Sequence, residues 1–491
     1  MANESDFYER LGLTRDASPE EIRRSYHEAA RRLHPDVNVE PGATEQFLGV
    51  QEAYEVLADP RKRMAYDNSL APQTDQKLLD LAVHYSRSSL PHLNEDQLVY
   101  VLLDMVPSQA LVMAPSPPLN VCLVLDCSTS MQGARLDTVK ATAIELVRNL
   151  NLRDSLSIVS FSDRAEVLLS AGERVDASQI ESRIRSLQTS GGTEIFHGLE
   201  AGLFEVRRNL LRSSINHIIL LTDGHTYGDE AACHQLAERA AASGIGLSAL
   251  GIGGEWNDMF LDGLASRTGG SSMYVSKPAD IERFLKEKLQ TLSRVLVENI
   301  ALNLEMEAEV VLRYAYRLEP QAGVIETSSP LRLGNIPKGE RLKVLLEFLL
   351  APIPSKRSRF TIGLGRLTFD APTEVTPGSV MRVRLERPVK ETDEFQESPK
   401  VLVDALEHLT LYRMQEKARQ EVAEGDIPNA TRHLHNLASQ LLAHGEGDLA
   451  RTALMEADHI RKRRTFSDEG VKQIKYGTRG LLLPDNVDLN L

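Results

Sequence analysis

The sequence predicts a multidomain protein with four parts: an all-α N-terminal domain, a doubly wound (Rossmann-like) α/β domain, an antiparallel β-sandwich that contains this domain as an insertion, and an α-helical C-terminal region. Three observations predict this fold class. The 491 residues are enough for three or four domains. The spacing of the apolar residues changes three times along the chain. The composition, 42% hydrophobic and 26% charged, is that of a folded globular protein.

Residues 1–70 carry helix signals and little strand character. Ser18-Pro19-Glu20-Glu21 supplies an N-cap, a proline at the first helical position and acids in the first turn. The helix is expected to end near His34-Pro35, because a residue that precedes proline is disfavoured in the α conformation. A second helix is predicted over residues 45–58, and a short basic helix over residues 59–67.

The next segments are expected to lead into the β-sandwich. Residues 71–96 are polar and mixed, which indicates a linker, with residues 77–85 as a candidate helix. In the segment 97–118, residues 97–106 form a dense apolar strand, and four prolines between Pro107 and Pro118 argue against a helix there. Apolar and other residues alternate in runs within residues 297–390, such as 300–306 and 360–364, so we expect the early strand to join an antiparallel sandwich formed by that later segment.

Between residues 119 and 296, continuous apolar runs alternate with amphipathic segments. Such runs are expected of parallel strands that are covered on both faces, and the alternation predicts a doubly wound sheet. Strands are predicted at residues 121–125, 155–161, 217–221 and 244–252, and helices at residues 137–150, 194–208, 229–242 and 279–296.

The last hundred residues return to helical spacing. Helices are predicted over residues 401–422, 428–443 and 449–463, within a helical region of residues 397–465. Residues 466–491 are expected to form a C-terminal tail that packs back on the body of the protein.

Composition and charge exclude several classes of protein. The formal net charge is −14 and the isoelectric point is near 5.5, which argues against a general nucleic-acid binder, since such proteins need clustered Lys and Arg. Only three cysteines occur, and no signal-peptide core follows Met1, so a reduced, cytoplasmic protein is expected. No apolar run reaches the roughly 18–20 residues needed to span a bilayer, so we expect no membrane interaction.

The first candidate site is the tripeptide His34-Pro35-Asp36, between two predicted antiparallel helices. A rigid loop that holds an imidazole and a carboxylate beside a basic helix is suited to contact an acidic protein surface. The alternative is that the tripeptide only ends the helix. The basic helix contributes Arg23, Arg24, His27, Arg31 and Arg32.

The residues around this tripeptide closely resemble a J domain, the DnaJ-like cochaperone module. The resemblance covers residues 5–70 in order and includes segments 6–13, 21–26, 52–61 and 63–67. It implies that His34, Pro35 and Asp36 engage a DnaK-family chaperone ATPase and that the basic helix steers the approach. His27 and Glu28 depart from the common Arg-Lys pair. Neither a Gly/Phe-rich segment nor repeated Cys-x-x-Cys zinc motifs follow, which indicates a J-domain fusion.

The second candidate site collects oxygen-bearing side chains from three loops. Asp126, Ser128 and Ser130 follow the first buried strand of the α/β domain, Thr193 precedes a helix, and Asp223 ends another strand. The carboxyl ends of parallel strands border the ligand crevice of such sheets, so these loops can converge. Hard oxygen donors with few carboxylates suit Mg²⁺. The alternative is that these residues merely cap the following helices.

This set resembles the metal-ion-dependent adhesion site of von Willebrand factor A domains. The resemblance implies that Ser128, Ser130 and Thr193 bind the ion directly, whereas Asp126 and Asp223 bind it largely through waters. The ion is expected to be Mg²⁺, with Mn²⁺ or Ca²⁺ as alternatives. An open coordination position would then accept an Asp or Glu from an unknown protein ligand. Thr129 replaces the glycine often found within the motif.

The two resemblances together suggest a J-domain cochaperone or scaffold that stimulates a DnaK-type ATPase and captures a protein partner through a Mg²⁺-dependent A domain. The alternative is a structural or signalling A-domain protein in which the J domain is only a regulatory or assembly element. An enzyme is not expected, because the chain has neither a Gly-x-Ser-x-Gly nucleophile elbow nor a phosphate-binding loop.

Overall fold

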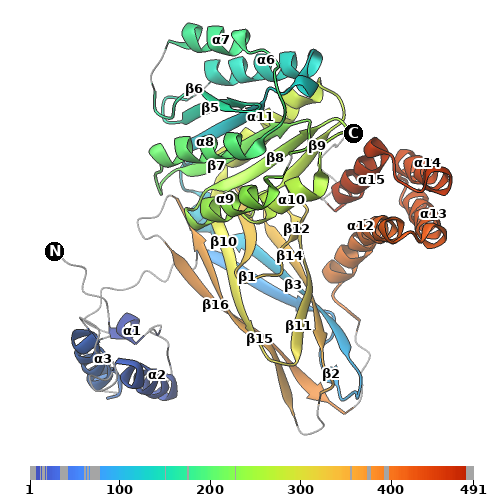
Figure 1. Cartoon of the computed structure of the whole chain (residues 1–491). Coiled ribbons are helices and arrows are strands. Elements are labelled where there is room, and N and C mark those ends of the chain that lie inside the picture. The colour runs from blue at the N-terminus through green and yellow to red at the C-terminus, as the bar shows by residue number, and fades with distance from the viewer. Residues whose placement is uncertain are drawn as a thin grey trace. The chain divides into compact units, whose positions relative to one another are not determined.

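The computed structural model of the chain describes residues 7–11, 13, 17, 19–33, 43–59, 62, 63, 66, 78–149, 151–173, 176–226, 228–353, 357–372, 378–391 and 397–482, with only the backbone described for residues 9, 20, 28, 31, 32 and 43–46. The chain divides into two compact units, Met1–Lys77 and Leu78–Leu491, which are described separately below. Figure 1 shows both units, with the ribbon coloured by position along the chain.

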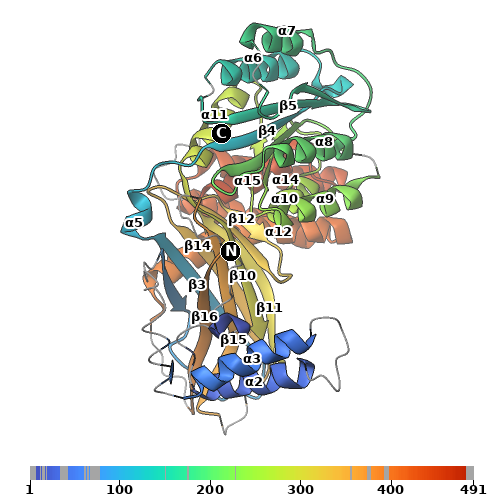
Figure 2. The same ribbon diagram turned by 90° about the vertical axis from the view of Figure 1, so that its left-hand side faces the viewer.

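The N-terminal unit is built from α1 (Phe7–Arg10), α2 (Pro19–Leu33) and α3 (Ala43–Leu57). Helix α2 begins at the proline and ends immediately before His34-Pro35, as the sequence signals predict. Figure 2 shows α2 and α3 side by side, and Tyr26 of α2 stacks on Tyr54 of α3 with 4.0 Å between ring centroids. Ile22 and Ala53 are fully buried between them. This small core fixes the orientation of the basic helix α2.

The β-sandwich has two five-stranded sheets whose inner faces share one hydrophobic core. All of its strand pairs are antiparallel except the short pair between β16 and β2. The first sheet has the order β1 (Leu79–Tyr85), β3 (Gln97–Pro107), β14 (Leu342–Leu350), β11 (Val310–Glu319) and β12 (Gly323–Ile325). The second has the order β13 (Leu331–Pro337), β10 (Val295–Met306), β15 (Arg359–Asp370), β16 (Ser379–Lys390) and β2 (Leu90–Pro91).

Two segments before the α/β domain differ from the sequence expectation. The C-terminal part of the expected linker, residues 71–96, contains strands β1 and β2, and residues 79–85 are a strand rather than a helix. Leu79 is fully buried and the strand pairs along its length with β3, so sheet pairing decides its conformation. The Pro-rich segment contains one short helix, α5 (Gln109–Val112), which fits between Pro107 and Pro115.

The α/β domain contains a six-stranded sheet that is parallel except for its edge strand β6. The strand order is β6 (Ala165–Leu169), β5 (Ser155–Phe161), β4 (Leu119–Asp126), β7 (Ile215–Thr222), β8 (Gly246–Ile252) and β9 (Ser272–Val275). Helices α6 (Ala134–Arg148), α7 (Ala177–Ser186) and α11 (Asp280–Ser293) pack on one face, and α8 (Ile195–Arg208), α9 (Glu230–Ala242) and α10 (Asp258–Ser266) pack on the other (Figure 2). This arrangement confirms the predicted doubly wound fold.

Helix α8 lies unusually close to the sheet because two of its residues are glycines. A Cβ atom on Gly198 would lie 2.6 Å from the ring of Phe161 in β5, and one on Gly202 would lie 2.6 Å from Val124 in β4. Both distances are too short for a real contact. The two glycines therefore allow α8 to pack directly on β4 and β5, which places the N-terminus of α8 beside the carboxyl ends of these strands.

The C-terminal region contains four helices, α12 (Lys400–Glu424), α13 (Ile427–Ala443), α14 (Gly447–Arg463) and α15 (Asp468–Gly480). Half of the expected tail, residues 466–491, is thus a fourth helix, α15. Its N-cap is Ser467, whose hydroxyl accepts a hydrogen bond from the Gly470 amide at 3.1 Å. Gly477 lowers the intrinsic helix propensity, but a Cβ there would lie 2.6 Å from Leu449 of α14. The glycine therefore allows α15 to pack closely on α14 without displacing the Leu449 side chain.

Two further features bear on the environment of the protein. None of the helices within the described ranges is long and apolar enough to cross a membrane. The three cysteines, Cys122, Cys127 and Cys233, are buried and are not paired in disulfides.

Candidate functional site

The five oxygen-bearing residues predicted to form a metal site meet at the carboxyl edge of the parallel sheet. Asp126 is the last residue of β4, and Ser128 and Ser130 lie in the turn that follows, which includes the 3-10 helix Thr129–Met131. Asp223 directly follows β7, the neighbour of β4, and Thr193 lies just before α8. Ser130 is exposed, whereas the other four are buried.

Hydrogen bonds connect the turn after β4 to the end of β7. The hydroxyl oxygens of Ser128 and Ser130 are 2.9 Å apart, and the Ser130 hydroxyl donates to Oδ1 of Asp223 at 2.6 Å. Asp126 accepts from the Ser128 amide at 2.8 Å and from the Thr222 hydroxyl at 2.6 Å. Burial raises the pKa of Asp126, while these hydrogen bonds to its carboxylate oppose the shift. Asp126 therefore fixes the turn that presents both serines.

Thr193 reaches the same place through a glycine-containing loop. Its hydroxyl oxygen would lie 2.8 Å from a Cβ atom on Gly224, the residue after Asp223. The loop is held by Asp163, whose carboxylate accepts from the Gly192 amide at 2.6 Å. Gly191 has φ of +67°, and a Cβ there would clash with Asp163 at 2.2 Å. The two glycines thus allow the loop to bring Thr193 beside Asp223.

The chemistry of this set fits a hard divalent cation. Three hydroxyls and two carboxylates supply only oxygen donors, which Mg²⁺ prefers. Among the described residues, no group of three or more His, Cys, Asp and Glu side chains is placed to hold a metal ion, so the hydroxyls are an essential part of this donor set. Burial raises the pKa of the neighbouring Cys127 to about 12, so this thiol stays protonated and is a poor ligand. The residues present therefore match the predicted Mg²⁺ donor set.

Arg135 also belongs to this site, and the sequence analysis missed it. It lies in the first turn of α6, where its guanidinium forms an ion pair with Asp223 and donates to the Ser130 carbonyl at 3.3 Å. Arg135 is about one-third exposed, whereas Asp223 is fully buried. No local sequence pattern links Arg135 to Asp223, because 88 residues separate them. The site consequently contains one fixed positive charge beside its two carboxylates.

The predicted chaperone-binding residues are only partly described by the structure. His34, Pro35 and Asp36 lie outside the described residues. Arg23, Arg24 and His27 are exposed on α2. Arg31 and Arg32 lie in the last turn of α2 without described side chains. Residues 24, 27 and 31 recur at intervals of three and four and so share one helix face, which leads toward the tripeptide.

Comparison with known families supports both modules. The chain matches the DnaJ domain family over residues 6–67, the von Willebrand factor type A domain family over residues 120–287, and the family described as the Sll0103-like, C-terminal alpha-helical domain over residues 400–484.

Curated relatives match different parts of the chain. An uncharacterised protein of Synechocystis, sll0103, is 28% identical over 334 residues, which cover 65% of this chain and 78% of that protein. The chaperone protein DnaJ of Methanosarcina thermophila is 57% identical over 67 residues. The DnaJ of Streptococcus uberis is 51% identical over 65 residues. Each of these two alignments spans only 17% of the DnaJ protein.

Two solved structures share the architecture of the larger unit. A von Willebrand factor type A protein from Catenulispora acidiphila superimposes with a TM-score of 0.62 at 15% identity, covering 84% of this chain and 99% of that chain. The ArnB paralog VWA2 from Sulfolobus acidocaldarius gives a TM-score of 0.53 at 14% identity, covering 83% and 99%. At these identities the likeness concerns the fold alone. The chain therefore joins a DnaJ domain and a von Willebrand factor type A domain, followed by a C-terminal helical domain of the Sll0103-like type.

Proposed function

We propose that this protein is a J-domain cochaperone or scaffold that stimulates a DnaK-type chaperone ATPase and holds a protein partner through a cation-dependent A domain. One observation carries this proposal. The same chain contains a DnaJ domain with His34-Pro35-Asp36 and an A domain in which five oxygen-bearing residues from three loops converge. Two recognition modules on one chain raise the effective concentration of the ATPase near the captured partner.

In the J domain, the tripeptide His34-Pro35-Asp36 would contact the chaperone ATPase. The chain as a whole has a net charge of −14, so attraction to an acidic surface depends on the local basic face of α2. Arg24 and His27 are exposed on that helix, and Arg31 continues the same face toward the tripeptide. Such a basic face speeds the association of the J domain with the chaperone and sets their relative orientation, and it contributes less to the affinity of the complex.

In the A domain, the hydroxyls of Ser128, Ser130 and Thr193 would hold a Mg²⁺ ion, while Asp126 and Asp223 would act largely through waters. The ion supplies a positive centre that binds a carboxylate of the partner protein. Asp126 is already engaged by the Ser128 amide and the Thr222 hydroxyl, which suits an indirect role. The buried, unpaired thiols suit a reducing compartment, and we place the protein in the cytoplasm.

A refolding assay tests the proposed coupling of the two modules. A chemically denatured reporter enzyme is mixed with the DnaK-type chaperone, ATP, Mg²⁺ and the full-length protein, and recovered reporter activity is measured. We expect the intact chain to increase the yield. The Asp36→Asn variant should lose the increase, because it lacks the carboxylate of the tripeptide. The Ser128→Ala/Ser130→Ala variant should also lose the increase in yield, because it no longer captures the client. It should still stimulate the ATPase.

The alternative function gives a different pattern in this assay. If the J domain is only a regulatory or assembly element of a structural A-domain protein, the intact chain and both variants will recover the same amount of reporter. That outcome would contradict the cochaperone proposal.

A further inference from the structure

A cavity of about 650 Å³ lies where three parts of the larger unit meet. The A domain contributes β9 and α11, the sandwich contributes β3 and the turns after β11 and β13, and the C-terminal region contributes α15. Its walls include the apolar side chains of Val112, Met273, Phe284 and Ala322. This volume lies within the range of about 300–1,000 Å³ that is usual for small-molecule sites. None of the five residues of the candidate metal site lines this cavity.

Lys288 of α11 lines this cavity and is buried, with 8% of its surface exposed. Its Nζ lies 3.2 Å from the side-chain oxygen of Gln321 and 3.4 Å from the hydroxyl of Ser271. Within the part of the chain that the structure describes, this amine forms no ion pair with a carboxylate. Buried lysines are rarely left without an acidic partner. Burial, together with the charge of Arg317, lowers the pKa of Lys288 to about 7.

The nearby Arg317 adds a second buried positive charge. Among the residues that the structure describes, its guanidinium donates only to backbone carbonyls, at 2.7 Å to Gly269, 2.5 Å to Gly270, 3.0 Å to Leu333 and 2.7 Å to Gln321. Its donors are therefore committed to the fold, but its charge is not neutralised by a carboxylate. Arg317 and the protonated form of Lys288, neither of which pairs with an acid among the described residues, create a positive potential at this end of the cavity.

The other cations around the cavity already have acidic partners. Arg294 lies 3.8 Å from Glu340, Arg341 lies 3.0 Å from Asp104, and Arg479 lies 2.7 Å from Asp262. Lys288 is thus the cation in the cavity wall that is left to pair with a negatively charged ligand. Three acids, Glu287, Glu319 and Glu340, also line the cavity, and Glu319 is paired with Lys343 at 2.7 Å. Their negative charge repels a doubly charged anion such as phosphate more strongly than a singly charged carboxylate.

From this arrangement we infer that the cavity binds a small amphipathic monocarboxylate, with its carboxylate on Nζ of Lys288 and its apolar chain along Val112, Met273, Phe284 and Ala322. The walls of the cavity come from the A domain, the sandwich and α15, so the ligand would lie where these three parts meet. The site is separate from the proposed chaperone and metal sites and does not depend on either function.

Isothermal titration of octanoate into the full-length protein tests this inference. Octanamide, which has the same chain without the charge, and inorganic phosphate are titrated in parallel. We expect saturable octanoate binding that exceeds the binding of both comparison compounds. Lys288→Met should weaken octanoate binding by about tenfold or more, since charge-assisted hydrogen bonds contribute strongly.

Lys286→Met is the matched control, because Lys286 lies on the same helix, is about one-third exposed and pairs with Glu145 and Glu282. It should bind octanoate like the wild type. The inference is overturned if octanoate does not bind saturably, if octanamide or phosphate binds as well as octanoate, or if both lysine variants lose affinity equally. The comparison of octanoate with octanamide uses the unaltered protein, so it decides the question even if Lys288→Met fails to fold.

Discussion

Replacing Arg479 by Met is expected to lower the free energy of unfolding by about 3–5 kcal/mol, because removing one partner from a buried ion network leaves a buried charge poorly compensated. Arg479 lies on α15 and has 8% of its side chain exposed. Its two terminal nitrogens donate to both carboxylate oxygens of Asp262 in α10, at 3.1 and 2.7 Å. The charges of Arg479 and Lys475 lower the pKa of Asp262, although its burial alone would raise it.

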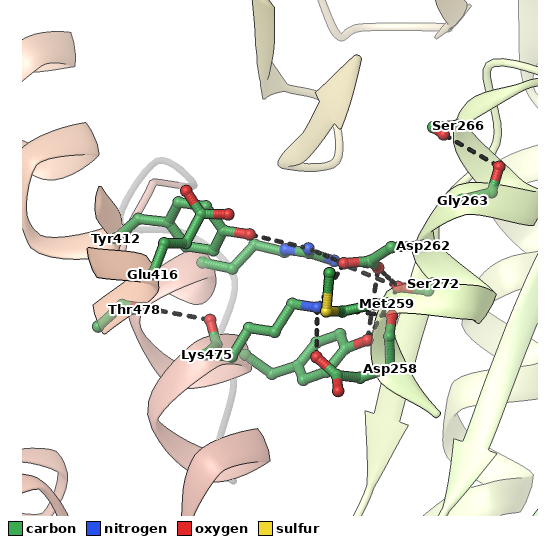
Figure 3. A network of polar contacts seen from close by, with 12 residues as sticks. Asp258, Met259, Asp262, Gly263, Ser266, Ser272, Tyr412, Glu416, Lys475 and Thr478 are labelled. Atoms are coloured by element: carbon green, nitrogen blue, oxygen red, sulfur yellow. Dashed lines mark hydrogen bonds and ion pairs between the residues drawn. The ribbon is translucent and has the colours of Figure 1, made fainter. Parts of the chain in front are cut away.

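The network joins the C-terminal helices to the A domain, as Figure 3 shows for Lys475 of α15, Tyr412 and Glu416 of α12, and Asp258 and Asp262 of α10. Lys475 contacts Asp258 at 2.5 Å and Asp262 at 2.6 Å. A second arginine, Arg419 of α12, contacts Asp258 at 2.6 Å. Two aspartates of α10 are therefore neutralised by basic side chains of α12 and α15 in a buried network. Removal of one charged group leaves its partners less well compensated.

Urea unfolding followed by tryptophan fluorescence measures the effect of Arg479→Met. Trp256 is the only tryptophan of the chain, is 1% exposed, and lies 5.9 Å from the ring of Tyr476 on α15, so its emission reports the release of this helix. The matched control is Arg461→Met, because Arg461 pairs with Asp458 but is two-thirds exposed. Its expected effect is below about 1 kcal/mol. Equal effects of the two substitutions would refute a stabilising role for the buried network.

Loss of both serine hydroxyls in the turn after β4 is expected to abolish binding of Mg²⁺. In the intact protein, saturating Mg²⁺ should raise the midpoint of thermal unfolding, because a ligand at about 100 times its Kd stabilises the native state by about 2.7 kcal/mol. The Ser128→Ala/Ser130→Ala variant lacks two of the three proposed direct ligands. Its unfolding midpoint should therefore not respond to Mg²⁺ or Mn²⁺, as measured by differential scanning calorimetry.

Thr129→Val is the control for this experiment. Thr129 lies between the two serines and is exposed, but it is not one of the five proposed metal-site residues. Its hydroxyl donates a hydrogen bond to the Gly191 carbonyl at 3.2 Å. Its loss should leave the response to Mg²⁺ intact. A full Mg²⁺ response in the double-alanine variant would show that the cation binds elsewhere, and loss of the response in Thr129→Val would show that the turn was disturbed nonspecifically.

Local sequence signals were sufficient to predict much of the fold. Pro19 and Pro35 bracket α2, and the continuous apolar runs of the α/β domain correspond to its central strands. Strand β1 was missed because its identity depends on pairing with β3 rather than on its own mixed composition. Gly477 and Gly480 weaken the helical pattern of residues 468–480, so the sequence alone does not indicate helix α15. In the structure, its packing on α14 and its ion pairs stabilise this helix.

In the candidate sites, too, residues close together in the sequence were predictable, whereas contacts between distant segments were not. The spacing of Asp126, Ser128 and Ser130 marks one loop, and the parallel sheet topology explains why Thr193 and Asp223 join it. The contact of Arg135 with Asp223 spans 88 residues, so no local pattern revealed it. Lys288 reads as part of an ordinary amphipathic helix, and its lack of an acidic partner becomes visible only when the sandwich and α15 pack around α11.

The steady-state ATPase rate of a DnaK-family chaperone, measured with the full-length protein and its Asp36→Asn variant, tests the proposed cochaperone function most directly. Glu55→Gln serves as the control, because Glu55 is an exposed acid on α3 of the same unit. We expect the intact protein and Glu55→Gln to stimulate hydrolysis equally and Asp36→Asn to leave the chaperone at its basal rate. Equal stimulation by the intact protein and Asp36→Asn, or no stimulation by the intact protein, would contradict the proposal.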